Sequence, residues 1–76
     1  MKVGVVIGKF LPPNQGNISV CHVANLSSDS LIIIVLFTPR DPISIDLRTK
    51  WLIEEFPNAE IKVLKLRSQF NEDYFL

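Results

Sequence analysis

The residues that could do chemistry lie between positions 8 and 17, where an apolar run gives way to a loop. Gly8 and Gly16 let a ligand approach the backbone closely, and Lys9 adds a cationic side chain. A helix that begins beyond Pro13 would present unpaired N–H groups and partial positive charge at its first turn. A strand, a glycine-bearing loop and a helix start together favour phosphate. The stretch therefore predicts a phosphate site, although it holds neither the dinucleotide pattern G-x-G-x-x-G nor a Walker sequence.

The run from Gly8 to Asn17 resembles the G-x-F-x-P-x-H-x-G-H signature of the nucleotidyltransferase superfamily. Both histidine positions hold asparagine, at Asn14 and Asn17. The run is most similar to the nicotinamide mononucleotide adenylyltransferase domain of bifunctional bacterial NAD-biosynthesis proteins, in which lysine often follows the first glycine, as Lys9 does here. The similarity covers roughly residues 2 to 65. Nothing in the chain matches the second motif of the family, a Ser/Thr-rich helix start with an arginine that binds the triphosphate.

The resemblance implies adenylyl transfer from ATP, with Mg²⁺, to a nucleotide monophosphate such as nicotinamide mononucleotide. It places Asn14, Asn17 and Lys9 in the catalytic positions. Asparagine donates a neutral hydrogen bond but cannot become cationic, so we expect impaired transfer. The alternative is a non-catalytic nucleotide-binding or interaction module derived from such an enzyme. The expected nucleotide-binding residues are Ile7, Gly8, Lys9, Phe10, Gly16, Arg48 and Trp51.

Three side chains outside the motif have two interpretations each. Arg48 and Trp51 are three residues apart on a predicted helix and hence neighbours. In similar adenylyltransferases an arginine here lies near the nucleotide and a tryptophan can stack on the second base. The structural interpretation makes Arg48 a surface charge and Trp51 a core residue. Arg40 follows a predicted strand, where it could meet an anion or form a solvated pair with Asp41.

The composition restricts the class of protein. A chain of 76 residues, 47% of them hydrophobic, forms one small domain. Eight basic and eight acidic side chains cancel, which disfavours nucleic acid and membrane surfaces as partners. The single cysteine, Cys21, is expected to be a buried hydrophobe, and no spaced cluster predicts a metal site. This cysteine usage favours a cytoplasmic location. His22 is expected to be a solvated or edge residue.

Hydrophobic patterning predicts three strands that alternate with two helices. This order implies a Rossmann-like α/β fold, a three-stranded parallel sheet (βαβαβ) that resembles the N-terminal half of a nucleotidyltransferase domain. The domain is expected over residues 1–67, and the tail 68–76 is unassigned. The strands are expected over residues 2–7, 31–37 and 60–66, and the helices over 15–26 and from a Ser44 cap to a stop at Pro57.

The same patterning predicts which faces are buried. The first two strands are apolar without alternation, which predicts cover on both faces and an interior place for the first strand. The third strand, with one wetter face, is expected at an edge. Without a second half, the first strand would expose an apolar edge, so we expect self-association, a missing partner segment or poor solubility. The residues of the first helix expected to face the sheet are Ile18, Val20, Cys21 and Ala24. In the second helix, apolar residues recur at helical spacing at Ile45, Leu52, Ile53 and Phe56.

Overall fold

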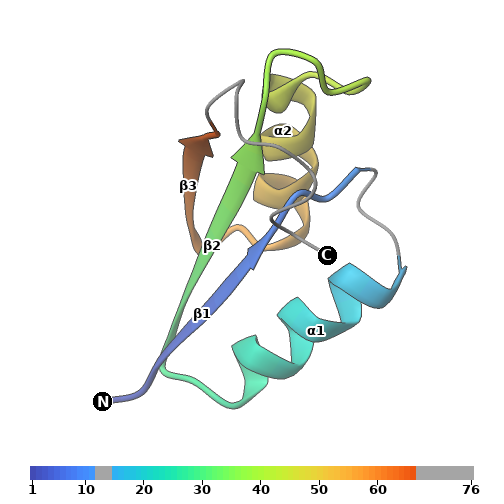
Figure 1. The fold of residues 1–76 in the computed structure, drawn as a ribbon. Coiled ribbons are helices and arrows are strands. Elements are labelled where there is room, and N and C mark those ends of the chain that lie inside the picture. Colours follow the sequence, from blue (N-terminus) through green and yellow to red (C-terminus); the bar gives the residue numbers. More distant parts are fainter. Residues whose placement is uncertain (12–14, 67–76) are drawn as a thin grey trace.

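The described part of the chain forms a three-stranded parallel sheet with two helices. The computed structural model describes residues 1–11 and 15–66, so Asn14 and the tail 68–76 lie outside the described residues. The strand order is β1-β2-β3, with both pairs parallel. The predicted Rossmann-like βαβαβ arrangement is therefore confirmed (Figure 1). The elements are β1 (Val3–Gly8), α1 (Gln15–Leu26), β2 (Ser30–Phe37), α2 (Ile45–Glu55) and β3 (Glu60–Lys65).

Local signals set the bounds of α2. The Ser44 side chain accepts a hydrogen bond from the Leu47 N–H at 3.1 Å, which satisfies a donor that the first helical turn leaves unpaired. Asp46 lies in that first turn, where a negative charge complements the helix dipole. The helix ends at Phe56, whose N–H bonds the Leu52 carbonyl just before Pro57. The predicted cap and stop are both confirmed.

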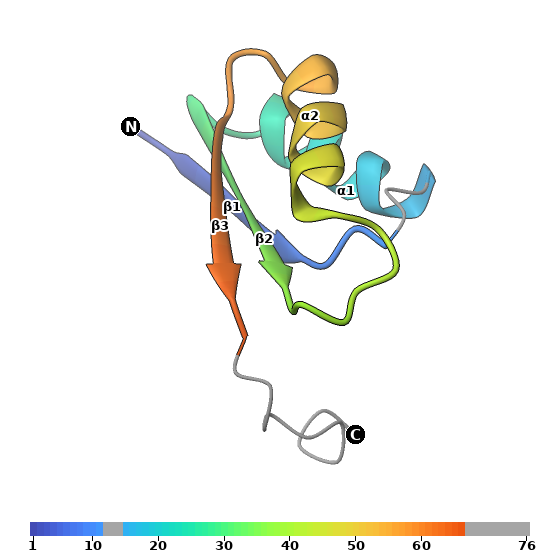
Figure 2. The same cartoon turned by 90° about the horizontal axis from the view of Figure 1, so that it is seen from above.

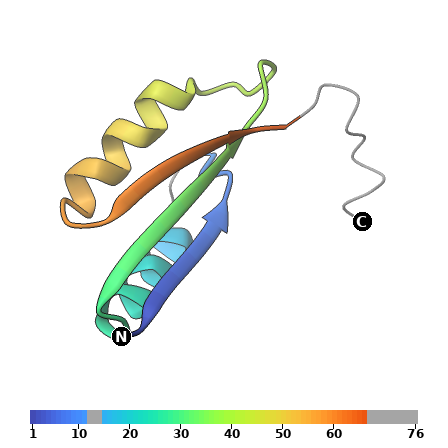
Figure 3. The same ribbon diagram turned by 90° about the vertical axis from the view of Figure 1, so that its left-hand side faces the viewer.

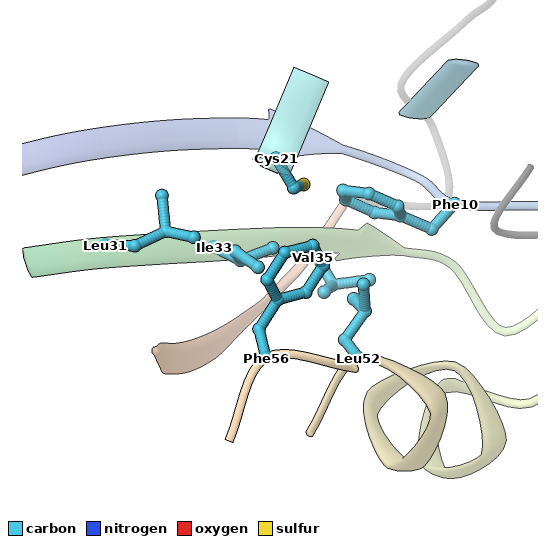
Figure 4. Close-up of a cluster of buried hydrophobic side chains, with 7 residues drawn as sticks. All are labelled: Phe10, Cys21, Leu31, Ile33, Val35, Leu52 and Phe56. Carbon is cyan, nitrogen blue, oxygen red and sulfur yellow. The ribbon is translucent and has the colours of Figure 1, made fainter. Parts of the chain in front are cut away.

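Both helices pack on the same face of the sheet. The chain steps in one direction from β1 to β2 to β3, so two right-handed crossovers place α1 and α2 on one side. Figure 2 shows the two helices together on one side of the strands, and Figure 3 shows α1 near β1 and α2 near β3. The core lies between these layers (Figure 4) and consists of Phe10, Cys21, Leu31, Ile33, Val35, Leu52 and Phe56.

The opposite face of the sheet carries no helix of the described residues. In β2, Leu31, Ile33 and Val35 are buried, whereas the residues between them are only partly buried. In β1, Val5 and Ile7 are 53% and 60% exposed. The prediction that both strands are covered on both faces was wrong, and β1 lies at an edge instead of the interior. An apolar run indicates that a strand can be buried, but the handedness of the crossovers decides which face of the sheet the helices cover.

The helix contacts were predicted in part. Ile18, Cys21 and Ala24 pack against the core as expected, but Val20 is 58% exposed. On α2, Leu52 and Phe56 of the apolar pattern are buried, whereas Ile53 is 54% exposed. Each helix meets the sheet along one stripe, and apolar residues beside that stripe turn toward solvent.

Gly4 allows α1 to approach β1. A Cβ atom at this position would lie 3.2 Å from the Ala24 carbonyl oxygen and would overlap the Ser28 hydroxyl. The end of this crossover is further held by a hydrogen bond of 2.8 Å from the Asp29 N–H to the Lys2 carbonyl. These contacts bring α1 against β1, with its N-terminal end toward the loop that follows Gly8.

Candidate functional site

The candidate site lies at the ends of β1 and β2, which we call the carboxyl edge. Here the loop after β1, with Lys9 and Phe10, lies beside the loop after β2, with Thr38 and Asp41. Because the strands are parallel, both loops leave the sheet at the same end. Ligands of open α/β sheets bind at this end. The arrangement places the predicted phosphate-binding loop where such a site belongs.

Arg48 is buried beneath the carboxyl edge and has no exposed surface. Its Nη1 donates to the Lys9 carbonyl at 2.7 Å and to the Leu36 carbonyl at 3.1 Å. Its Nη2 forms an ion pair of 2.8 Å with Asp41 Oδ2. The guanidinium thus joins the ends of β1 and β2 to α2. The interpretation of Arg48 as a surface charge was wrong, and its hydrogen bonds go to protein acceptors.

Asp41 is the acceptor around which the second loop folds. Its carboxylate accepts from the Thr38 N–H at 2.8 Å, from Thr38 Oγ1 at 2.9 Å and from Arg48, with Lys9 Nζ at 3.4 Å. Burial by itself raises the pKa of Asp41, but the bonds from Thr38, Arg48 and Lys9 outweigh it and lower the pKa from 3.8 to about 2. Asp41 is therefore ionised at neutral pH. The expected pair between Arg40 and Asp41 is replaced by these bonds.

The loop after β1 has an unusual backbone. Phe10 adopts a φ of 54°, the left-handed region that side chains other than glycine rarely occupy, yet its ring is buried in the core. Gly8 makes room for that ring, because a Cβ on Gly8 would lie 3.3 Å from it. The bond from Arg48 holds the Lys9 carbonyl just before Phe10. Burial and this hydrogen bond together maintain a conformation that costs on the order of 1 to 3 kcal/mol.

Lys9 differs from Arg48 in being accessible. Its side chain is 44% exposed, and its Nζ lies 3.4 Å from Asp41 Oδ1, which is long for a charged hydrogen bond. Because this ion pair is long and its ammonium group is exposed, it contributes little to stability. The ammonium group can therefore exchange Asp41 for an incoming anion at small cost.

The remaining predicted site residues are dispersed. Gly16 is exposed and Asn17 half-buried in the first turn of α1, whereas Asn14 lies outside the described residues. The Ile7 side chain points to the face without helices. Trp51 is 36% exposed on α2, so it is not a core residue. Among the described residues the structure thus brings together Gly8, Lys9, Phe10 and Arg48, the last from a distant part of the sequence.

The sequence interpretation missed two partners. Thr38 and Asp41 have the spacing of a capping box, [ST]-x-x-[DE], and the bond from the Thr38 N–H to the Asp41 carboxylate follows that pattern, so this signal was present in the sequence. The Thr38 hydroxyl departs from the pattern, because it donates to the same carboxylate. His22 is exposed, as expected, and its Nε2 lies 3.0 Å from Glu55 Oε1, a partner that the sequence interpretation did not identify. Its ring also lies 4.7 Å from the Phe56 ring. This contact joins α1 to α2 on the side of the helices away from the candidate site, and no local sequence spacing predicts it.

The described residues do not form a binding site for Mg²⁺. No group of three His, Cys, Asp or Glu side chains in residues 1–11 and 15–66 gathers around a common point. Asp41 is the carboxylate that meets Lys9 and Arg48 at this edge, and these donors and Thr38 occupy both of its oxygens. Protein-bound Mg²⁺ needs one or two free carboxylates together with substrate phosphates. The residues therefore do not fit a resident metal ion.

Comparisons with known proteins add no family to the fold class that the structure defines. The described residues define a Rossmann-like α/β unit with a cationic loop at its carboxyl edge. No protein-family model matches the chain, and no curated protein matches it. Neither of the helices in the described ranges has the length and apolar character needed to cross a membrane.

Proposed function

We propose that the chain is a nucleotidyltransferase-like protein that binds the phosphates of a nucleotide at its carboxyl edge. The observation that carries the proposal is Lys9, an accessible ammonium group on a loop whose backbone is fixed by Arg48 and Phe10. A fixed loop places this cation without an ordering cost when the ligand binds. The first turn of α1 follows the loop and supplies N–H groups that favour anions.

The proposed reaction is adenylyl transfer. A phosphate oxygen of a nucleotide monophosphate attacks the α-phosphorus of ATP, a new P–O bond forms, and the bond to the leaving pyrophosphate breaks. The protein aligns the two phosphates and neutralises their charge. Lys9 supplies positive charge, while Asn14 and Asn17 supply neutral amide donors. Because no group of three His, Cys, Asp or Glu side chains among the described residues could hold a metal ion, Mg²⁺ would arrive with the triphosphate.

The alternative function is nucleotide binding without catalysis. It is favoured by the substitution of asparagine at both histidine positions of the motif. Loss of a preorganised donor to the transition state costs about a hundredfold to a thousandfold in rate, and two such losses remove most activity. Binding tolerates the change better, because a neutral amide still donates a hydrogen bond to phosphate.

Calorimetric titration of the chain with ATP, AMP and nicotinamide mononucleotide tests binding. We expect Lys9→Gln to weaken binding about tenfold, because the hydrogen bond to a charged group becomes neutral. Lys50→Gln removes an exposed charge from α2 and serves as the matched control. Equal affinities for the two variants and the unchanged chain would place the site elsewhere. Binding of none of the three nucleotides would contradict the proposal as a whole.

Release of pyrophosphate tests catalysis separately. We expect little turnover by the chain as it stands and a measurable increase in the double variant Asn14→His and Asn17→His, which restores both histidines of the motif. Binding without turnover in either form would select the non-catalytic alternative. The affinity of the double variant for ATP serves as the control, because we expect this affinity to change far less than the rate of pyrophosphate release.

We also propose a cytoplasmic location for this activity. The single cysteine is buried, and burial raises the pKa of the Cys21 thiol, which keeps it in the unreactive protonated form. A nucleotide-binding role also requires the intracellular supply of ATP. Localisation of a tagged chain in fractionated cells tests this assignment, and recovery from an extracellular fraction would contradict it.

A further inference from the structure

The side of the sheet without helices forms an apolar surface, which we call the open sheet face. Val5 and Ile7 of β1 are more than half exposed on it, and Leu64 of β3 is 53% exposed. Ile32 and Ile34 of the central strand are half-buried only by their neighbours in the sheet. None of the described residues covers this face. A contiguous apolar patch on a small protein marks an interaction surface.

The strand register arranges the open sheet face in rows. Val5, Ile32 and Glu60 lie side by side in one row across the three strands. The next row on the same face, two residues further along each strand, contains Ile7, Ile34 and Lys62. The intervening row of Val6, Ile33 and Ile61 points toward the helices. The two outward rows thus carry similar apolar residues in β1 and β2, whereas in β3 one row carries a negative charge and the other a positive charge.

This pattern is complementary to itself. The relevant twofold axis runs across the strands and lies in front of the Val6, Ile33 and Ile61 row. Rotation about this axis stacks each strand on the same strand of the second copy, and the two stacked strands are antiparallel. Ile32 of one copy then faces Ile34 of the other. Glu60 of one copy faces Lys62 of the other, and the same pair recurs on the other side of the axis. The stack matches the aligned packing of two sheets about 10 Å apart.

We propose that two copies of this chain associate through their open sheet faces about this axis. The open sheet face is complementary to a second copy of itself, because the stacking that brings isoleucine opposite isoleucine also brings opposite charges together at the rim. The face measures roughly 14 by 20 Å from the strand spacing and rise, which is smaller than a standard interface. The dimer is therefore weak and concentration-dependent, in the micromolar range. The proposal does not depend on nucleotide binding.

Sedimentation velocity over micromolar to millimolar concentrations of the full chain tests the proposal. Glu60→Lys and Lys62→Glu each change one exposed side chain of β3, so the core is untouched. Each variant places like charges opposite one another at two symmetric positions, and we expect its Kd for self-association to rise about tenfold. Lys50→Glu on α2 alters the net charge as Lys62→Glu does and is the matched control, with an unchanged Kd expected.

Two further samples test the axis. In an equimolar mixture of the Glu60→Lys and Lys62→Glu variants, opposite charges face each other again, so we expect a heterodimer with the affinity of the unchanged chain. The double variant with both changes also restores complementarity, and its self-association should recover. Circular dichroism of each variant checks that the fold is retained.

Two results would overturn the proposal. A monomer at every concentration would show that two copies do not associate through this face. A dimer whose Kd in both single variants equals that of the unchanged chain would use another surface, such as the unpaired edge of β1. Recovery in the mixture and in the double variant distinguishes the proposed stack from a general effect of net charge, because the double variant has the net charge of the unchanged chain.

Discussion

Two cations at the carboxyl edge have opposite roles. Arg48 has no exposed surface and donates to three carbonyls and a carboxylate, so it holds the two loops together. Lys9, on the loop that Arg48 fixes, is 44% exposed and lies 3.4 Å from Asp41. The residue type alone does not distinguish a structural cation from a ligand-binding one. Burial and the number of protein acceptors do, because a buried charge must be fully paired whereas an exposed one can change partners.

The largest expected effect comes from Arg48→Met, which removes the buried cation and leaves Asp41 without its main partner. We expect a loss of about 3 to 5 kcal/mol in the free energy of unfolding, the usual cost of breaking a buried ion pair. Urea denaturation measures this loss. Lys50→Met, on the exposed side of the same helix, is the control and should change stability by less than about 0.5 kcal/mol. A loss below about 1 kcal/mol for Arg48→Met would contradict the structural role.

Acid should weaken the same pair. The pKa of Asp41 is lowered from 3.8 to about 2 in the folded chain, so the carboxylate stabilises the fold above pH 4 and loses this contribution as the pH falls through about 2. The contribution is roughly 2 kcal/mol. We expect the stability difference between the unchanged chain and Asp41→Asn to shrink over this interval. A difference that stays constant with pH would contradict the charge-based explanation.

Gly8→Ala tests how firmly Phe10 is held. The added methyl group would lie 3.3 Å from the Phe10 ring, and the ring cannot move freely because it is buried on a backbone of positive φ. We expect a loss of about 1 kcal/mol, at the lower end of the cost of overpacking. Thermal unfolding followed by circular dichroism measures it. An increase in stability would show that the loop adjusts easily.

The smallest expected effect on stability comes from Lys9→Gln. The exposed pair with Asp41 contributes less than about 0.5 kcal/mol, so the unfolding free energy should hardly change. The same variant is expected to bind nucleotides about tenfold more weakly. Stability retained with binding lost would sharpen the contrast with Arg48. A loss of stability comparable to that of Arg48→Met would remove the contrast.

Local signals predicted the elements of this chain well. β-branched runs gave the strands to within two residues, and the Ser44 cap and the stop at Pro57 gave the bounds of α2. The site was predicted less completely. Gly8, Lys9 and Phe10 were expected in a ligand-binding loop after the first strand, but Arg48 was expected either at the surface or at a nucleotide. Apart from the Ser44 carbonyl one helical turn away, its acceptors are at Lys9, Leu36 and Asp41, outside α2, and local sequence spacing does not connect them to this helix.

The sequence by itself determined that this chain folds as alternating strands and helices. It also determined that a loop containing Gly8 and Lys9 follows the first strand. Periodicity, caps and turn residues act between near neighbours, so they can be interpreted without the fold. Only the tertiary structure decided that Arg48 is buried and that both helices of the described residues lie on one face of the sheet. Both follow from the handedness of the crossovers, which brings distant segments together and leaves the far side of the sheet open.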